Sequence, residues 1–357
     1  MSLSPAKPVP VFDGHNDLLY RLFISEAEDP VSVFLQGNGE GHLDLPRCRQ
    51  GGFAGGMFAI FVPSTVFTDP AELTKDKSAR LPPTPELPAA QQATIKMAAL
   101  LLRIEERAPE DFKVCRSAAD IETAMQSGKI AAVMHVEGLE AVGPDLFMLD
   151  VLHAAGLRSL GPVWSRPNIF GHGVPFRFNS TPDTGEGLTE VGKALIRRCN
   201  QLKILIDLSH LNERGFWDVA ALSDAPLVAT HSNVHALCPH ARNLTPRQLA
   251  AIRESRGMVG VNFATAFLRD DGRTEPETPL EDIVRHLAAL IEALGEDHVG
   301  LGSDFDGAAI PRPLRDAAGL PALLEACSNA GFGAALIEKI AHRNWLNLLR
   351  RTWGEAA

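Results

Sequence analysis

The sequence has few cysteines, no long apolar run and no excess of basic residues, and each of these absences excludes a class of protein. Its 357 residues include five cysteines, none of which stands in a Cys-x-x-Cys pair. An odd and scattered set of this kind predicts neither a disulfide framework nor a thiolate zinc site. The formal net charge is -10 and the basic residues are dispersed, which argues against a nucleic-acid partner.

Membrane segments and targeting signals are also missing. Hydrophobic residues make up 45% of the chain and charged residues 22%, so a large core can form. No apolar run approaches the roughly 20 residues that a membrane-spanning helix needs. Residues 1–9 contain one lysine and no apolar stretch, and the last seven residues form no hydrophobic tail. These features predict a cytoplasmic protein that does not enter a membrane.

Short apolar stretches alternate with helical patterns along the chain. Eight stretches are typical of buried strands: 9–12, 57–62, 130–136, 157–163, 204–208, 226–230, 257–262 and 299–302. Apolar residues recur at helical spacing in residues 91–106, 189–201, 213–222, 245–254 and 280–294. This alternation predicts a parallel sheet. Eight units without a dinucleotide-binding fingerprint favour a closed (β/α)₈ TIM barrel over an open doubly wound sheet.

The barrel is predicted to form a single domain over residues 1–357. Length alone would allow two domains of roughly 150 residues each, but no Ser/Gly linker or abrupt change of composition marks a boundary. Residues 67–90 are rich in proline, threonine and charge, and 311–313 read Pro-Arg-Pro. Both segments are predicted to be loop insertions that shape the barrel mouth. Residues 322–349 are predicted to be helical.

Side chains that can bind a metal follow several predicted strands. His15 and Asp17 lie two residues apart at the end of the first strand, so in extended backbone both point the same way. His210 and His231 follow two successive strands. Each alone is more often a structural or surface group, but the carboxyl ends of barrel strands meet at one mouth. Together they predict a transition-metal centre there, with Asp207 in a supporting role.

Two further acids extend this site. Glu137 ends the strand 130–136, where a buried carboxylate is costly unless a metal or an arginine satisfies it. His135 lies on the same face and is an alternative, but we favour Glu137 as the ligand and His135 as a packed neighbour. Asp304 follows the last strand among small residues and is predicted to accept a proton from metal-bound water. A turn or helix cap is the other interpretation, and it fits Asp306 better.

Eight motifs follow one another in a characteristic order along the chain. They are residues 13–17, 41–46, 52–56, 136–138, 208–210, 230–232, 242–243 and 302–307. In this order they resemble the renal (membrane) dipeptidase family of zinc peptidases, M19, a branch of the amidohydrolase superfamily of metal-dependent barrels. A single element such as Asp-Gly-His is a weak signal, whereas the ordered set is specific and spans almost the whole chain.

The resemblance implies a binuclear centre with two Zn²⁺ ions per chain. His15 and Asp17 would bind one ion, His210 and His231 would bind the other, and Glu137 would bridge them. A hydroxide between the ions would attack the peptide bond. Mn²⁺, Fe²⁺ or Co²⁺ would suit the same nitrogen and oxygen ligands.

The same resemblance assigns residues around the metals. Asp304 would pass its proton to the leaving amine, and Arg242 would hold the C-terminal carboxylate of the substrate, although a surface arginine is the alternative. Mammalian members carry a substrate-binding histidine where this chain has Trp164. His172, a little downstream, would either supply an imidazole from a loop or face solvent.

These features predict a dipeptidase that hydrolyses short peptides with a free C-terminal carboxylate, including dipeptides with a D-residue at that position. Hydrolysis of N-acyl amino acids or cyclic amides by the same metals is an alternative. A metal-binding protein without catalysis is another, but it would not need Asp304. The expected partners are a small peptide substrate and, from the resemblance, a second copy of the chain in a homodimer.

Overall fold

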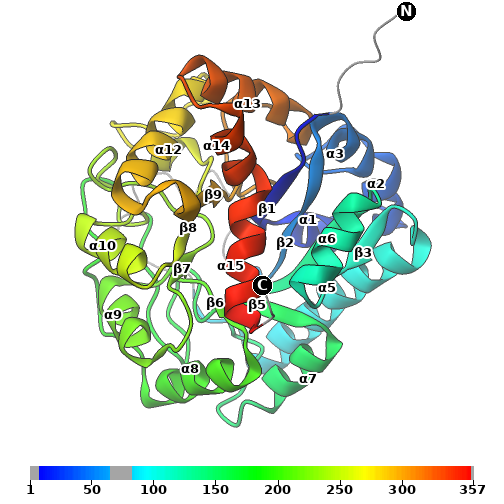
Figure 1. The fold of residues 1–357 in the computed structure, drawn as a ribbon. Coiled ribbons are helices and arrows are strands. Elements are labelled where there is room, and N and C mark those ends of the chain that lie inside the picture. Colours follow the sequence, from blue (N-terminus) through cyan, green and yellow to red (C-terminus); the bar gives the residue numbers. More distant parts are fainter. Residues whose placement is uncertain (1–7, 65–82, 355–357) are drawn as a thin grey trace, which may run out of the picture.

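A nearly closed barrel of parallel strands forms the centre of the molecule, and helices surround it (Figure 1). The computed structural model describes residues 8–64 and 83–354. Neighbouring strands follow the order β6-β5-β4-β2-β1-β9-β8-β7, and a parallel bridge from Asp207 to Val228 joins the two ends. The strands are β1 (Val11–Asn16), β2 (Phe53–Phe61), β4 (Ile130–Glu137), β5 (Leu157–Gly161), β6 (Leu205–Ile206), β7 (Val228–Ala229), β8 (Met258–Val261) and β9 (Val299–Leu301). The predicted TIM barrel is confirmed.

The helices that follow the strands cover the outside of the barrel (Figure 1). They are α1 (Leu18–Ile24), α2 (Pro30–Gln36), α3 (Leu45–Gly51), α5 (Leu87–Arg107), α6 (Ala118–Gln126), α7 (Phe147–Ala155), α8 (Glu190–Leu202), α9 (Glu213–Leu222), α10 (Pro246–Glu254), α11 (Thr265–Leu268), α12 (Leu280–Leu294), α13 (Leu320–Asn329) and α14 (Ala334–Glu338). The last helix, α15 (Asn344–Trp353), instead crosses one end of the barrel. Each of the five helical patterns identified in the sequence is a helix. Within the described residues, no helix is both long and apolar enough to cross a membrane.

Several predicted boundaries are wrong, and three of them have a clear physical reason. Residues 87–90 were expected in a loop but form the first turn of α5, where Pro88 suits a helix start because its missing N–H has no partner there anyway. The rest of that predicted loop lies partly outside the described residues, which stop at 64 and resume at 83. β1 runs through Asp13 and His15 to Asn16, because buried polar residues interrupt its apolar pattern. The helical stretch 322–349 is divided near Gly331, whose φ is +92°.

One further strand, β3 (Phe112–Val114), lies outside the eight-stranded barrel and was not predicted. It pairs with the first three residues of β4, while β5 pairs with the later ones. Three residues with one exposed lysine between two buried apolar groups are too short for a pattern to stand out.

One end of the barrel is closed by Trp345 from α15, the helix that crosses the middle of Figure 1. Its ring is fully buried, and its Nε1 donates to the carbonyl of Leu301 at 2.9 Å. A Cβ atom at Gly14, Gly260 or Gly300 would come within 3.0 Å of this ring. Gly14, Gly260 and Gly300, one each from β1, β8 and β9, therefore make room for the tryptophan ring.

Candidate metal centre

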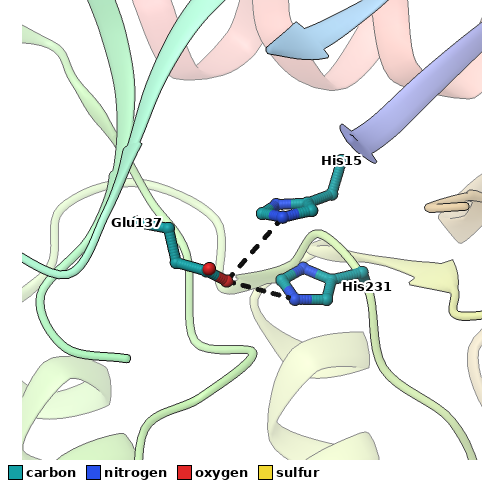
Figure 2. Close-up of side chains that lie close together, drawn as sticks. All are labelled: His15, Glu137 and His231. Atoms are coloured by element: carbon teal, nitrogen blue, oxygen red, sulfur yellow. Dashed lines mark ion pairs between the residues drawn. The ribbon is translucent and has the colours of Figure 1, made fainter. Parts of the chain in front are cut away.

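The five predicted ligands meet at the carboxyl ends of the strands, as Figure 2 shows for three of them. Oε1 of Glu137, the last residue of β4, lies 3.0 Å from Nε2 of His210, 3.4 Å from Nε2 of His231 and 3.7 Å from Nε2 of His15. Oδ2 of Asp17 lies 3.3 Å from the same His15 nitrogen. Four strands therefore bring three imidazoles and two carboxylates to one point.

Asp17 occupies a position where its carboxylate would normally cap a helix. It is the N-cap residue of α1, yet its side chain makes no capping hydrogen bond among the described residues. A capping aspartate contributes about 1 kcal/mol to a helix. The chain gives up that contribution and turns the carboxylate towards His15, which is the orientation a metal ligand requires.

Several buried atoms of the cluster have no hydrogen-bond partner in the described part of the chain. They are both ring nitrogens of His15 and Oε1 of Glu137. His15 is fully buried and Glu137 is 4% exposed. Nε2 of His210 faces Nε2 of His231 at 3.1 Å. Unsatisfied buried polar atoms are costly, so this set of nitrogen and oxygen donors fits divalent metal ions.

A chain of hydrogen bonds behind His231 fixes its proton. The Thr230 hydroxyl donates to Oδ2 of Asp207 at 2.5 Å, and Nδ1 of His231 lies 2.8 Å from that hydroxyl oxygen. Since the hydroxyl proton points to Asp207, the hydroxyl oxygen accepts from Nδ1, and Nε2 is left with a lone pair for a metal. Ser209 Oγ donates to the other oxygen of Asp207 at 2.6 Å. Asp207 therefore has the supporting position that the sequence predicts.

Burial dominates the electrostatics of the cluster. It raises the pKa of Glu137 well above its usual range and also raises the pKa of Asp17. It lowers the pKa values of His210 and His231 well below theirs. For His15, burial lowers the pKa, but the neighbouring carboxylates, Glu137 foremost, outweigh it and raise the value to about 10. The neutral imidazoles of His210 and His231, and the pKa of His15 raised by the carboxylates beside it, indicate a negative potential at the cluster, which favours a bound cation.

Asp304 lies beside this cluster, on the loop that follows β9. An imidazole nitrogen of His15 and one carboxylate oxygen each of Asp17 and Asp304 lie within 4.8 Å of one another. Asn262 Nδ2 donates to Oδ2 of Asp304 at 2.9 Å. A Cβ atom on Gly307 would overlap Oδ2 of Asp17 and lie 2.7 Å from Oδ1 of Asp304. A glycine is therefore needed at 307 for the two carboxylates to approach each other.

Asp306 has a structural role, but through long-range bonds to Arg21 and His42 rather than through the turn or helix cap that its sequence context suggests. Its Oδ2 lies 3.0 Å from Nε of Arg21, and its Oδ1 accepts from the backbone N–H of His42 at 2.5 Å. The backbone N–H of Asp306 donates in return to Nδ1 of His42 at 2.8 Å. This reciprocal pair ties the segment before α3 to the loop that carries Asp304. The 41–46 motif is part of the family resemblance, which implied no structural role for it.

A cavity opens from the cluster, and its described lining has two parts. The acidic part includes Asp17, Glu137 and Asp304, and the aromatic part includes Phe61, Trp164, Phe176 and Phe267. His172 is not among the described lining residues, and its ring lies next to Gly185. The structure therefore brings Trp164 to the cavity but not His172, and a loop imidazole at this place has no geometric support.

Arg242 is 2% exposed, so the alternative of a surface arginine is wrong. Its NH2 lies 3.2 Å from Nε2 of His210 and 3.3 Å from the carbonyl of His231, and its NH1 donates to the carbonyl of Ser209. Burial lowers its pKa to about 10, so the guanidinium stays charged at neutral pH. A fixed cation thus lies beside the ligand cluster.

A (β/α)₈ barrel with a His/Glu/Asp cluster at the carboxyl ends of its strands defines a metal-dependent hydrolase of the amidohydrolase type. The model of the membrane dipeptidase family, peptidase family M19, matches residues 6–356. The chain belongs to this family and is a metallo-dipeptidase.

Similar proteins agree with this assignment. A crystal structure of a metallopeptidase from Rhodobacter sphaeroides, liganded with a phosphinate mimic of the dipeptide L-Ala-D-Ala, is 56% identical, with a TM-score of 0.94 over 97% of this chain and 100% of that one. A second, named dipeptidase AC, is 57% identical, with a TM-score of 0.92 over 97% and 99%. The dipeptidase tcpJ of Claviceps purpurea is 28% identical over 97% of this chain and 77% of its own length.

Proposed function

We propose that this dipeptidase works with two Zn²⁺ ions held by the five ligands. His15 and Asp17 would hold one ion, His210 and His231 would hold the other, and Glu137 would contribute to both. The observation that carries the proposal is the approach of three imidazole Nε2 atoms to within 3.7 Å of one Glu137 oxygen. That oxygen and both His15 nitrogens make no hydrogen bond among the described residues.

When bound, the ions would polarise the scissile carbonyl and make water a nucleophile near neutral pH. The rest of the reaction falls to side chains. Asp304 accepts the proton of the attacking water and passes it to the leaving amine. We assign the proton to its Oδ1, because Oδ2 accepts from Asn262.

Arg242 holds the C-terminal carboxylate of the substrate. The support for this role is its burial and the 3.2 Å distance between its NH2 and Nε2 of His210, which puts a fixed positive charge next to the reacting centre. A buried guanidinium can bind a carboxylate through two parallel hydrogen bonds. An enzyme that recognises this end group cleaves the last peptide bond of its substrate and leaves internal peptide bonds alone.

We further propose that the enzyme accepts a D-residue at the C-terminal position. The support is the Rhodobacter sphaeroides structure, which is 56% identical and holds a mimic of L-Ala-D-Ala. The single-domain organisation, the cytoplasmic location and a homodimeric state also stand as proposals. Light scattering of the purified protein tests the last of these.

The direct test is the release of free amino acids from matched L,L and L,D dipeptides, with N-acetyl amino acids in the same panel. Cleavage should disappear with chelator and return with Zn²⁺, and elemental analysis should find two ions per chain. Hydrolysis of the N-acetyl amino acids alone would favour the alternative amidohydrolase activity. Turnover that survives complete metal removal would contradict the proposal.

A further inference from the structure

The cavity has an apolar end that the reaction itself does not require. The rings of Phe176 and Phe267 lie parallel there, with centroids 6.1 Å apart and an angle of 6° between them. Phe267 packs with Ala264 and Ala266 in a small apolar cluster, against which Phe176 also packs. The ring of Trp164 continues the surface, 5.5 Å from the ring of Phe176. These residues all line the cavity.

The apolar end adjoins the group that binds the substrate's carboxylate. The Arg242 guanidinium lies over the ring of Phe267, 5.5 Å from its centroid, and the ring of Phe176 lies 6.3 Å from that of His210. A residue whose carboxylate contacts Arg242 and whose amide lies at the ligand cluster therefore has these two phenylalanine rings within reach of its side chain.

Among the described residues, the cations near this end are already engaged, since Arg242 would hold the substrate's own carboxylate and Arg166 is bound within the protein. The described lining contains no lysine or arginine. The nearest guanidinium behind the aromatic surface, Arg166, is fully buried and already bound: its Nε donates to Glu140 at 2.7 Å, its NH1 to Ser64 at 2.5 Å and its NH2 to the carbonyl of Val62 at 2.6 Å. It lies behind the ring of Trp164, 5.3 Å from the centroid, and stabilises that surface.

We propose that Phe176, Phe267, Ala264 and Ala266 form the subsite for the side chain of the substrate's C-terminal residue, and that this subsite takes an uncharged, apolar side chain. The inference rests on the proposed function, since Arg242 must hold the C-terminal carboxylate. Apolar side chains bind there because the subsite removes their apolar surface from contact with water. An acidic side chain of similar size would lose its hydration without gaining a partner.

The test compares L-Ala-Xaa dipeptides in which Xaa is Leu, Asn or Asp, each in L and D form. Leu and Asp are similar in size, and Asn separates polarity from charge. We expect kcat/KM for the better stereoisomer to be at least tenfold higher for Leu than for Asp, with Asn between them, because a well-filled apolar pocket discriminates by roughly 10- to 200-fold.

Phe176→Ala should reduce kcat/KM for the Leu substrate about tenfold and leave L-Ala-Gly little changed, since glycine has no side chain for the subsite. Phe176→Leu should retain most of the preference. The matched control is Phe178→Ala, because Phe178 is 38% exposed and is not among the described lining residues. It should behave as wild type. Equal losses on the Leu and Gly substrates would overturn the subsite.

Binding of the same dipeptides to the metal-loaded Asp304→Asn protein, measured by calorimetry, separates the two proposals. If the wild type cleaves none of them but Leu still binds more tightly than Asp, the dipeptidase proposal fails and the subsite stands. If the wild type cleaves them with Asp equal to or better than Leu, the subsite fails and the dipeptidase proposal stands. If neither cleavage nor binding occurs, both are overturned.

Discussion

Replacing Thr230 by valine should weaken metal binding although Thr230 is not itself a ligand. Valine keeps the shape of threonine and removes the hydroxyl, which donates to Asp207 at 2.5 Å and lies 2.8 Å from Nδ1 of His231. The backbone there is held in place, because a Cβ atom on Gly260 or Gly302 would overlap the Thr230 carbonyl. The substitution therefore removes two hydrogen bonds without moving the strand.

The expected magnitude follows from these two bonds. Each buried partner left unpaired costs roughly 1–3 kcal/mol, so the free energy of unfolding should fall by about 2–6 kcal/mol. His231 also loses the acceptor that holds its proton on Nδ1, so its proton is free to move to Nε2, the atom that faces the metal. Loss of such an outer hydrogen bond typically costs 10- to 100-fold in metal affinity or activity.

The assay is Zn²⁺ retention after dialysis against graded concentrations of chelator, read by elemental analysis, with chemical denaturation of the metal-free protein alongside. Thr230→Ser is the matched control, because it keeps the hydroxyl and loses only a methyl group. It should hold Zn²⁺ nearly as well as wild type. The reasoning is refuted if Thr230→Val retains Zn²⁺ as wild type does, or if Thr230→Ser is equally impaired.

Three further predictions concern Gly307 beside the ligand cluster, Trp345 at the closed end of the barrel and the buried Asp13 of β1. Gly307→Ala should lower kcat/KM by about 100-fold, because the added Cβ would overlap Oδ2 of Asp17 and small displacements of catalytic groups cost this much; a folded, fully active variant would contradict the steric argument. Trp345→Ala should cost about 3–5 kcal/mol in the free energy of unfolding, measured in urea, since it empties a fully buried site, while a loss below 1 kcal/mol would argue against the plug. Burial raises the pKa of Asp13 from 3.8 to about 7, so the folded metal-free protein binds this proton more tightly than the unfolded chain does. The stability from this group is complete below pH 4 and is lost as the pH rises to 7. Asp13→Asn should flatten that part of the profile, and identical pH profiles for the two proteins would rule the effect out.

The fold and the ligands were predictable because both depend on order along the chain. The alternation of strands and helices predicts the barrel, and parallel strands end on the same side, so His210 and His231 had to meet once the barrel was assumed. The reciprocal bonds between His42 and Asp306 were not predictable in this way, because the two residues are 264 positions apart and neither follows a periodic pattern. The position of His172 stayed open for a similar reason, because nearness in sequence to Trp164 says little about where a loop side chain points.

Stability and chemistry are separated along the length of a single strand and its extension. Gly300 lies in β9, Gly302 follows the last residue of that strand, and Asp304 lies two residues further along, where its φ of +59° departs from extended backbone. The first contacts the Trp345 ring, the second lets the Thr230 carbonyl approach, and the third reaches the cavity. Substitutions at the first two positions act on packing and so on folding, whereas a substitution at Asp304 removes a proton acceptor at the open end. One end of the barrel is filled by the Trp345 ring and the other opens into the cavity. Glycines therefore lie where the ring packs against the strands, and the acids and imidazoles lie where the strands end.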